Sequence, residues 1–72
     1  PKTALQEWAQ GKGLPLPGYD IVSQSGPDHA PVFEVSLNIK GHPAVTARGR
    51  SRADAEKKAA AEFMAGIPED ER

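Results

Sequence analysis

The stretch VFEVSLNI covers residues 32–39. Its side chains alternate strictly between apolar and polar from Phe33 to Ile39. Successive side chains of a β-strand point to opposite faces, so Phe33, Val35, Leu37 and Ile39 would share one face. The opposite face would carry only the polar side chains between them. This pattern predicts a strand in an antiparallel sheet that is covered on one side and meets water on the other.

Two further strands are predicted beside this one. YDIVSQS, residues 19–25, forms the first, and AVTARGR, residues 44–50, forms the third after the tight turn KGHP. In the third strand Val45, Ala47 and Gly49 fall on the covered side, because they alternate with polar residues. The sheet is therefore predicted to be a meander of neighbouring antiparallel strands.

Helical periodicity predicts a helix at the beginning of the chain. It runs from Pro1 to about Gln10 and ends at two glycines, Gly11 and Gly13. Its apolar side chains, at helical spacing, are Ala4, Leu5, Trp8 and Ala9. The stretch LPLPG that follows is predicted to be an extended connector, because a proline disfavours helix at the residue before it.

A second helix is predicted near the end of the chain. Ser51 would cap it through its hydroxyl, and Asp54, three positions later, would complete a capping box. Gly66 and Pro68 would end it. Its apolar stripe consists of Ala55, Ala59, Ala60, Phe63 and Met64.

This order predicts an α+β fold of the type α-β-β-β-α, a three-stranded antiparallel sheet with two helices on one face. A chain of 72 residues holds one small domain, predicted over residues 1–67, and the acidic tail 68–72 is expected to be disordered. There is no cysteine, which excludes disulfides and thiolate metal sites. No apolar run approaches the roughly 20 residues that cross a bilayer, and no signal-peptide pattern is present, so a soluble cytoplasmic domain is expected.

Basic residues are concentrated around the start of the second helix, although the formal net charge of the chain is −1. The stretch RGRSRADAEKK, residues 48–58, contains five basic residues and two acidic ones. The acidic tail PEDER offsets this local excess of positive charge in the net charge of the chain. A basic patch that binds an anionic partner is one interpretation, and a mixed, solvated surface is the other.

The first helix carries a polar stripe opposite its apolar side, made of Thr3, Gln6, Glu7 and Gln10. Amides and a carboxylate are poorly suited to phosphate. They suit the shallow minor groove of double-stranded RNA, because each 2′-hydroxyl both donates and accepts hydrogen bonds. An ordinary solvated helix face is the alternative.

His29 stands in a connection of about six residues between the first two strands, where a two-residue turn would be enough. Gly26 allows positive φ, Pro27 fixes its own φ, and Asp28 can bond back to the backbone. Such a loop would be stiff enough to hold His29 and the Pro27 carbonyl towards a ligand. The alternatives are a surface histidine without a role, a hydrogen bond that locks the loop, and half of a metal site with His42 or Asp28, for which the spacing gives no coordination set.

Four residues at the start of the second helix form a candidate phosphate site: Arg50, Ser51, Arg52 and Lys57. Unpaired N–H groups and the positive end of the helix dipole point the same way there. Two nearby cations are left out of the site. Lys58 is predicted to pair with Asp54 four residues earlier, and Arg48 with Glu34 across the sheet.

No catalytic constellation is present. The sequence has no paired-carboxylate motif, no GxSxG, no phosphate-cradling glycine-rich loop and no cysteine nucleophile. A small hydrolase that uses His29 and Asp28 is the weakest hypothesis. The residues favour a binding module.

Four stretches, TALQEWAQ, LPLPGY, GPDHAPVFEV and GRSRADAEKKAA, occur in the order and spacing typical of the double-stranded-RNA-binding domain. From Lys2 to Ile67 the chain most resembles the C-terminal domain of bacterial ribonuclease III. The resemblance implies that Thr3, Gln6 and Glu7 meet one RNA minor groove. The loop with Pro27 and His29 would meet the next minor groove, and the start of the second helix would grip the phosphates between them.

The resemblance also implies a longer parent enzyme that cleaves double-stranded RNA during processing of ribosomal and messenger RNA. A separate nuclease domain would hold Mg²⁺ through its carboxylates and form a homodimer. No cofactor is expected in the present chain, and the domain alone is expected to be a monomer. Its departures from the family pattern are Ala53, Asp54 and Glu56, where basic residues are common, so a weaker grip on phosphate is expected. The alternative function is a protein-interaction domain of the same fold that dimerises through the third strand or the second helix.

Overall fold

The computed structural model describes residues 2–68 and has the predicted order of elements. The helices and strands are α1 (Lys2–Gly11), β1 (Gly18–Ser25), β2 (Val32–Asn38), β3 (Val45–Gly49) and α2 (Arg52–Ala65). The predicted α-β-β-β-α fold is therefore confirmed. The predicted disordered tail lies, apart from Pro68, outside the described residues.

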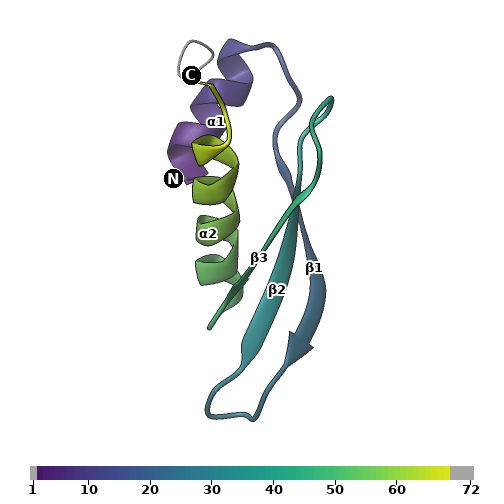
Figure 1. Ribbon diagram of the computed structural model, residues 1–72, viewed down its shortest axis with the longest axis vertical. Coiled ribbons are helices and arrows are strands. Elements are labelled where there is room, and N and C mark those ends of the chain that lie inside the picture. Colours follow the sequence, from purple (N-terminus) through teal and green to yellow (C-terminus); the bar gives the residue numbers. More distant parts are fainter. Residues whose placement is uncertain (1, 69–72) are drawn as a thin grey trace.

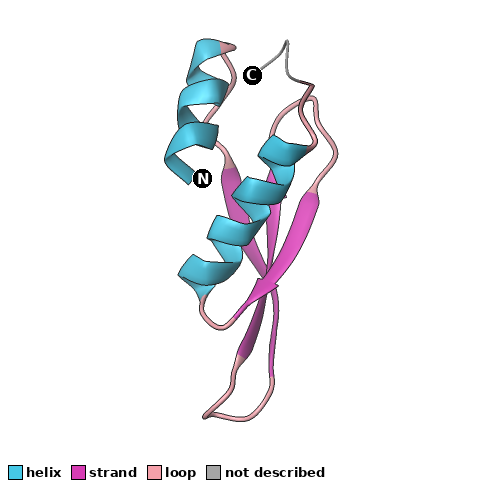
Figure 2. Ribbon diagram, turned by 60° about the vertical axis from the view of Figure 1, so that its left-hand side comes forward, coloured by secondary structure: helices cyan, strands magenta, loops and turns pink. Residues whose placement is uncertain are grey.

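The three strands form one antiparallel sheet in the order β1-β2-β3. Both helices lie on the same side of this sheet, and the β1–β2 hairpin extends beyond them (Figures 1 and 2). The molecule is accordingly elongated, with extents of 42 × 18 × 17 Å. The projecting hairpin places its connecting loop far from α1.

The alternation in β2 separates the two faces of the sheet as predicted. Val35, Leu37 and Ile39 are buried beneath the helices. On the opposite, wet face Glu34 pairs with Arg48 of β3, with 3.4 Å between Oε1 and Nε. This cross-strand pair was predicted from the sequence, and it is exposed enough that its net contribution to stability is small.

The edge strand β1 contains a β-bulge that the sequence analysis did not predict. Ile21 is paired with Val35 and Ser23 with Glu34, so Val22 is an extra residue between two successive pairs. Both Ile21 and Val22 remain exposed. A bulge twists an edge strand and interrupts its pattern of unpaired backbone groups, which disfavours pairing with another chain.

The helix α1 ends in a Schellman motif centred on Gly13. Leu14 N–H donates to the Ala9 carbonyl at 2.9 Å, and Gly13 N–H donates to the Gln10 carbonyl at 3.0 Å. Gly13 has a φ of 73°, the left-handed conformation that this motif requires. The helix α2 ends differently, because Gly66 has a right-handed φ of −84°, and the predicted glycine stop there does not use positive φ.

The core is formed by the apolar sides of both helices and of β2. It includes Leu5, Trp8, Ala9, Leu37, Ile39, Ala59, Ala60, Phe63 and Ile67. The small alanines of α2 let that helix lie close to the sheet. The buried positions of the helices agree with the predicted ones, except that Ala4 of α1 is exposed and Met64 of α2 is only half-buried. Both residues lie at an edge of the apolar side of their helix, where the neighbouring elements no longer cover it.

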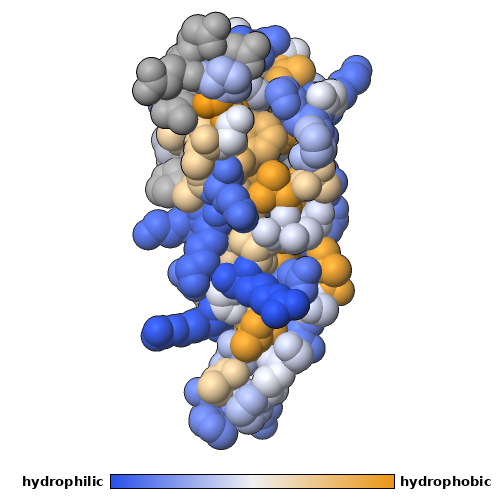
Figure 3. Space-filling view, in the orientation of Figure 1, coloured by the Kyte–Doolittle hydropathy of each residue, from blue (hydrophilic) through white to orange (hydrophobic). Residues whose placement is uncertain are grey.

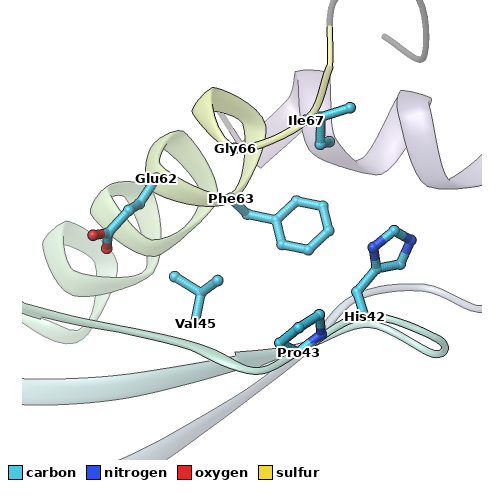
Figure 4. Close-up of a pocket in the computed structure, with 7 residues that line it drawn as sticks. All are labelled: His42, Pro43, Val45, Glu62, Phe63, Gly66 and Ile67. Carbon is cyan, nitrogen blue, oxygen red and sulfur yellow. The ribbon is translucent and has the colours of Figure 1, made fainter.

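Three aromatic rings connect α1, α2 and the β2–β3 turn. Trp8, His42 and Phe63 stand edge to face, with ring centroids 5.4–5.6 Å apart. Figure 4 shows the His42 and Phe63 rings directed towards one another, while Glu62 points away from them. Such contacts add to area burial, and they give His42 a packing role distant from the β1–β2 loop.

Candidate nucleic-acid interface

The polar stripe of α1 is exposed because the opposite side of the helix is in the core. Leu5, Trp8 and Ala9 are buried, and Thr3, Gln6 and Glu7 are exposed. Among the described side chains, none forms a hydrogen bond or ion pair with these three. Their polar groups are therefore free to meet a ligand, as predicted, and their role in binding stays a prediction.

The loop between β1 and β2 is held by its own backbone. Gly26 has a φ of 86°, and a Cβ there would lie 2.7 Å from the Ala30 carbonyl oxygen. Ala30 N–H donates to the Pro27 carbonyl at 2.9 Å and closes a turn around His29. The Pro27 carbonyl keeps a second lone pair for an external donor. His29 is exposed.

One detail of this loop differs from the sequence-based expectation. Among the described residues, the Asp28 side chain makes no hydrogen bond, so it does not brace the backbone. The hydrogen bond from Ala30 N–H to the Pro27 carbonyl braces the loop instead. The loop therefore depends on a backbone turn and a left-handed glycine.

The start of α2 is fixed against β3 by an unusually close approach. A Cβ on Gly49 would lie 2.5 Å from the Ala55 nitrogen and 2.6 Å from Asp54 Oδ2. Both Gly49 and Ala55 are buried. Only glycine allows this approach, so the first turn of α2 has a set position on the sheet.

The predicted capping box at Ser51 is present in altered form. Asp54 N–H donates to the Ser51 hydroxyl at 3.1 Å, as expected for the cap. The Asp54 carboxylate accepts from Arg50 N–H at 3.2 Å, whereas a capping box would use the N–H of Ser51. The reciprocal bond is thus shifted by one residue, and it also orders the backbone at Arg50.

The Asp54 carboxylate is stabilised in its charged form. The hydrogen bond from Arg50 N–H is the largest influence that holds the pKa of Asp54 below its usual value of 3.8, followed by the bond from Lys58. The Lys58 ammonium lies 3.2 Å from Asp54 Oδ2, which confirms the predicted pair. Lys58 is therefore directed back along the helix towards its start, and its ammonium is engaged there by the Asp54 carboxylate.

The cations of the candidate phosphate site divide into two kinds. Arg52 is paired with Glu56, with 2.8 Å between Nε and Oε2. Arg50 and Lys57 are exposed and form no ion pair with a described residue. The pairing of Arg52 was missed in the sequence, although an arginine four residues before a glutamate on a helix is a signal for it.

The three candidate regions follow one another along the long axis of the molecule. In Figures 1 and 2, α1 lies towards one end, the β1–β2 loop forms the other, and the start of α2 lies between them. Strongly hydrophilic side chains gather at the level where α2 begins (Figure 3). This is the order that the family resemblance implies for two minor-groove contacts with phosphate contacts between them, and the contacts themselves stay a prediction.

Neither a metal site nor a membrane span is found in the part of the chain that the structure describes. Residues 2–68 contain no group of three histidine, aspartate or glutamate side chains placed to hold a metal ion. None of the helices within that range is long and apolar enough to cross a membrane.

The fold and the exposed polar regions define a small α+β domain suited to nucleic acid, and comparison with known proteins supplies its family. The family model described as the double-stranded RNA binding motif matches residues 1–66. The chain belongs to this family.

Its relatives include bacterial proteins named Ribonuclease 3. It is 58% identical over 60 residues to that of Caulobacter vibrioides NA1000, covering 83% of this chain and 26% of that protein. It is 62% identical over 60 residues to that of Phenylobacterium zucineum, covering 83% of this chain and 25% of the relative. The chain thus spans about a quarter of the length of these curated relatives.

Solved structures of similar fold are also double-stranded-RNA-binding domains. The first such domain of protein HYL1 aligns with a TM-score of 0.62 and 36% identity, covering 85% of this chain and 84% of that one. The second domain of DRB4 aligns with a TM-score of 0.61 and 35% identity, covering 89% of this chain and 90% of that one.

Proposed function

We propose that this domain binds double-stranded RNA by its shape and serves as the RNA-binding module of a bacterial ribonuclease III. The observation that carries the proposal is the succession of α1, the start of α2 and the β1–β2 loop along a 42 Å axis. Domains of this family span roughly 16 base pairs, touching two successive minor grooves and the phosphates between them. The similarity to Ribonuclease 3 proteins supports the assignment to that enzyme.

The stripe Thr3, Gln6 and Glu7 would lie in one minor groove. Its hydroxyl, amide and carboxylate groups are exposed and unpaired among the described side chains. A carboxylate accepts a hydrogen bond from a 2′-hydroxyl, a group that DNA lacks. This contact would therefore favour RNA over DNA.

His29 and the Pro27 carbonyl would lie in the second minor groove. The turn closed by Ala30 N–H and the left-handed Gly26 hold them at the end of the hairpin before RNA arrives. Because the loop is already ordered, little conformational entropy is lost on binding. Its distance from α1 would let the domain measure the spacing of the grooves.

Arg50, Ser51, Arg52 and Lys57 would contact the phosphates between the two grooves. The helix start offers N–H groups and the positive end of its dipole in addition to the side chains. Carboxylates already neutralise Arg48, Arg52 and Lys58 in part. We therefore expect about two to four phosphate contacts and a shallow dependence of affinity on salt.

The remaining function would belong to the rest of a longer protein. A nuclease domain of the same chain would hold Mg²⁺, form a homodimer in the cytoplasm and cleave double-stranded RNA in ribosomal and messenger RNA processing. The domain described here would supply affinity and positioning and be monomeric alone. The share of about a quarter that it covers in its relatives is consistent with this division.

A titration with nucleic acid duplexes tests the proposal. The 72-residue chain is mixed with a 20-base-pair RNA duplex and with DNA of the same sequence, each at two salt concentrations. Binding to RNA alone with a shallow salt slope is expected. Equal binding to both duplexes would reduce the site to a basic patch at α2. Binding to neither, together with dimers in solution, would favour the alternative of a protein-interaction domain.

A further inference from the structure

Glu56 is the buried charged residue among those that the structure describes. It lies on α2, one turn after Arg52, and only 10% of its side chain is exposed. The partner Arg52 is 60% exposed and stands in the first turn of the helix. A carboxylate is rarely buried to this extent unless it is paired, and Arg52 is one of the partners of Glu56.

The bond between the two residues leaves the outer part of the guanidinium available. Arg52 Nε donates to Glu56 Oε2 at 2.8 Å, a short charge-assisted hydrogen bond. Nε is the inner donor of the guanidinium, and the terminal amino groups that grip a phosphate are further out. Glu56 therefore ties down the stem of Arg52 without occupying its outer donors.

The other ion pairs on this surface do not have this form. In Lys58–Asp54 the ammonium is the only donor group of its side chain, so pairing at 3.2 Å engages the same group that would meet RNA. In Arg48–Glu34 the arginine is 73% exposed and lies on the wet face of the sheet, outside the candidate phosphate site. Among the ion pairs between described residues, Glu56–Arg52 is the one that combines a buried acceptor with a cation of that site.

We propose that Glu56 is a positioning residue that orders Arg52 for phosphate before RNA binds. This inference rests on the proposed function, in which Arg52 contacts the RNA backbone. Ordering a long side chain in advance reduces the entropy lost on binding, while the negative charge of Glu56 weakens the attraction between Arg52 and phosphate. The two effects have opposite signs, and the proposal states that ordering is the larger one.

Two substitutions at Glu56 separate the effects. Glu56→Gln removes the charge and keeps an oxygen that accepts from Nε, so RNA affinity should stay equal to that of the wild type or rise. Glu56→Ala removes both, and affinity should fall about three- to tenfold although the site becomes more positive, because Arg52 must then be ordered by the RNA. If both variants bind RNA more tightly than wild type, the carboxylate only opposes phosphate and the inference is wrong.

Matched controls identify the origin of any change. Glu62→Ala removes another carboxylate from α2 at an exposed position away from the phosphate site and should leave affinity unchanged. Arg52→Ala tests the proposed function itself. If Arg52→Ala binds RNA like wild type, Arg52 makes no contact and the proposed site fails. If it weakens binding and Glu56→Ala still weakens binding equally in the Arg52→Ala background, the positioning role fails.

A measurement on the wild type covers the case in which Glu56→Ala does not fold. NMR relaxation of the arginine Nε–H groups in the free protein compares Arg52 with Arg50, which has no described ion pair. The Arg52 Nε–H should be clearly more ordered than that of Arg50. Equal mobility of the two groups would overturn the inference.

Discussion

The start of α2 and the β1–β2 loop serve the same proposed ligand and are held in place by different forces. The start of α2 is fixed by tertiary packing, since Gly49 lets Ala55 approach β3 closely and Ser51 caps the helix. The loop projects beyond both helices and is held by the left-handed Gly26 and the turn from Pro27 to Ala30.

This difference separates stability from binding. A change at the start of α2 disturbs the packing of a helix on the sheet and should alter the fold together with the site. A change in the loop should alter the site while the core remains. Glycine-to-alanine substitutions in the two regions test this difference, because they make the same chemical change in each.

Gly49→Ala should have the largest effect. The added Cβ would lie 2.5 Å from the Ala55 nitrogen, a backbone atom that can move only with α2. We expect the free energy of unfolding to fall by about 2 to 3 kcal/mol, as for other overpacked cores, measured by urea denaturation. Gly11→Ala is the matched control, because a Cβ there meets nothing within 4 Å. Equal stability of the two variants would contradict the tight packing at the start of α2.

Gly26→Ala should have an intermediate effect on stability and a clear effect on binding. A φ of 86° costs a non-glycine residue about 1 to 2 kcal/mol, and its Cβ also approaches the Ala30 carbonyl. We expect RNA affinity to fall about tenfold as the turn around His29 rearranges. Gly41→Ala has nearly the same φ, 85°, in the β2–β3 turn and should lose stability without losing affinity. If both variants bind RNA equally well, the loop shape does not matter.

His29→Ala should affect binding alone. The side chain is exposed, so the free energy of unfolding should not change. RNA affinity should fall about three- to tenfold, the range for one lost hydrogen bond, and Glu7→Ala should act similarly at the other minor groove. Isothermal titration with RNA and urea denaturation measure the two quantities. Unchanged RNA binding in both variants would show that His29 and Glu7 do not contact the minor grooves.

Asp54→Asn should have the smallest effect, a slight loss of stability near neutral pH that disappears in acid. Because the folded pKa of Asp54 is lowered, its carboxylate stabilises the fold above the unfolded value of 3.8. That stabilisation is lost as the pH falls below 3.8 and through the folded pKa. Thermal unfolding between pH 5 and pH 2 should thus depend less steeply on pH in Asp54→Asn than in wild type. An identical pH dependence would show that the bonds from Arg50 and Lys58 do not favour the charged form.

The features that the sequence predicted correctly depend on neighbours along the chain. The alternation from Phe33 to Ile39 predicts β2, the periodicity of α1 predicts its core side apart from Ala4, and Ser51 predicts the cap of α2. The pairs Arg48–Glu34 and Lys58–Asp54 were also predicted, because strand pairing and helix spacing determine them. In each case a regular repeat places the side chains.

The features that were missed depend on how separate elements meet. The bulge at Val22 follows from the register between β1 and β2, which no local pattern in β1 specifies. The shift of the Asp54 bond to Arg50 reflects the path of the chain out of β3. The spacing of four residues could have predicted that Glu56 pairs with Arg52. It could not have predicted that the Glu56 side chain is buried, because burial depends on what α2 packs against.

An NMR titration of the isotope-labelled chain with a 20-base-pair RNA duplex shows whether all three candidate regions contact the same RNA. It follows the backbone amide signals of Glu7, His29 and Arg52, one from each candidate region. We expect all three signals to shift together and to saturate at the same ratio of RNA to protein. Shifts confined to Arg52, with Glu7 and His29 unchanged at saturation, would contradict this expectation and leave only a basic patch at the start of α2.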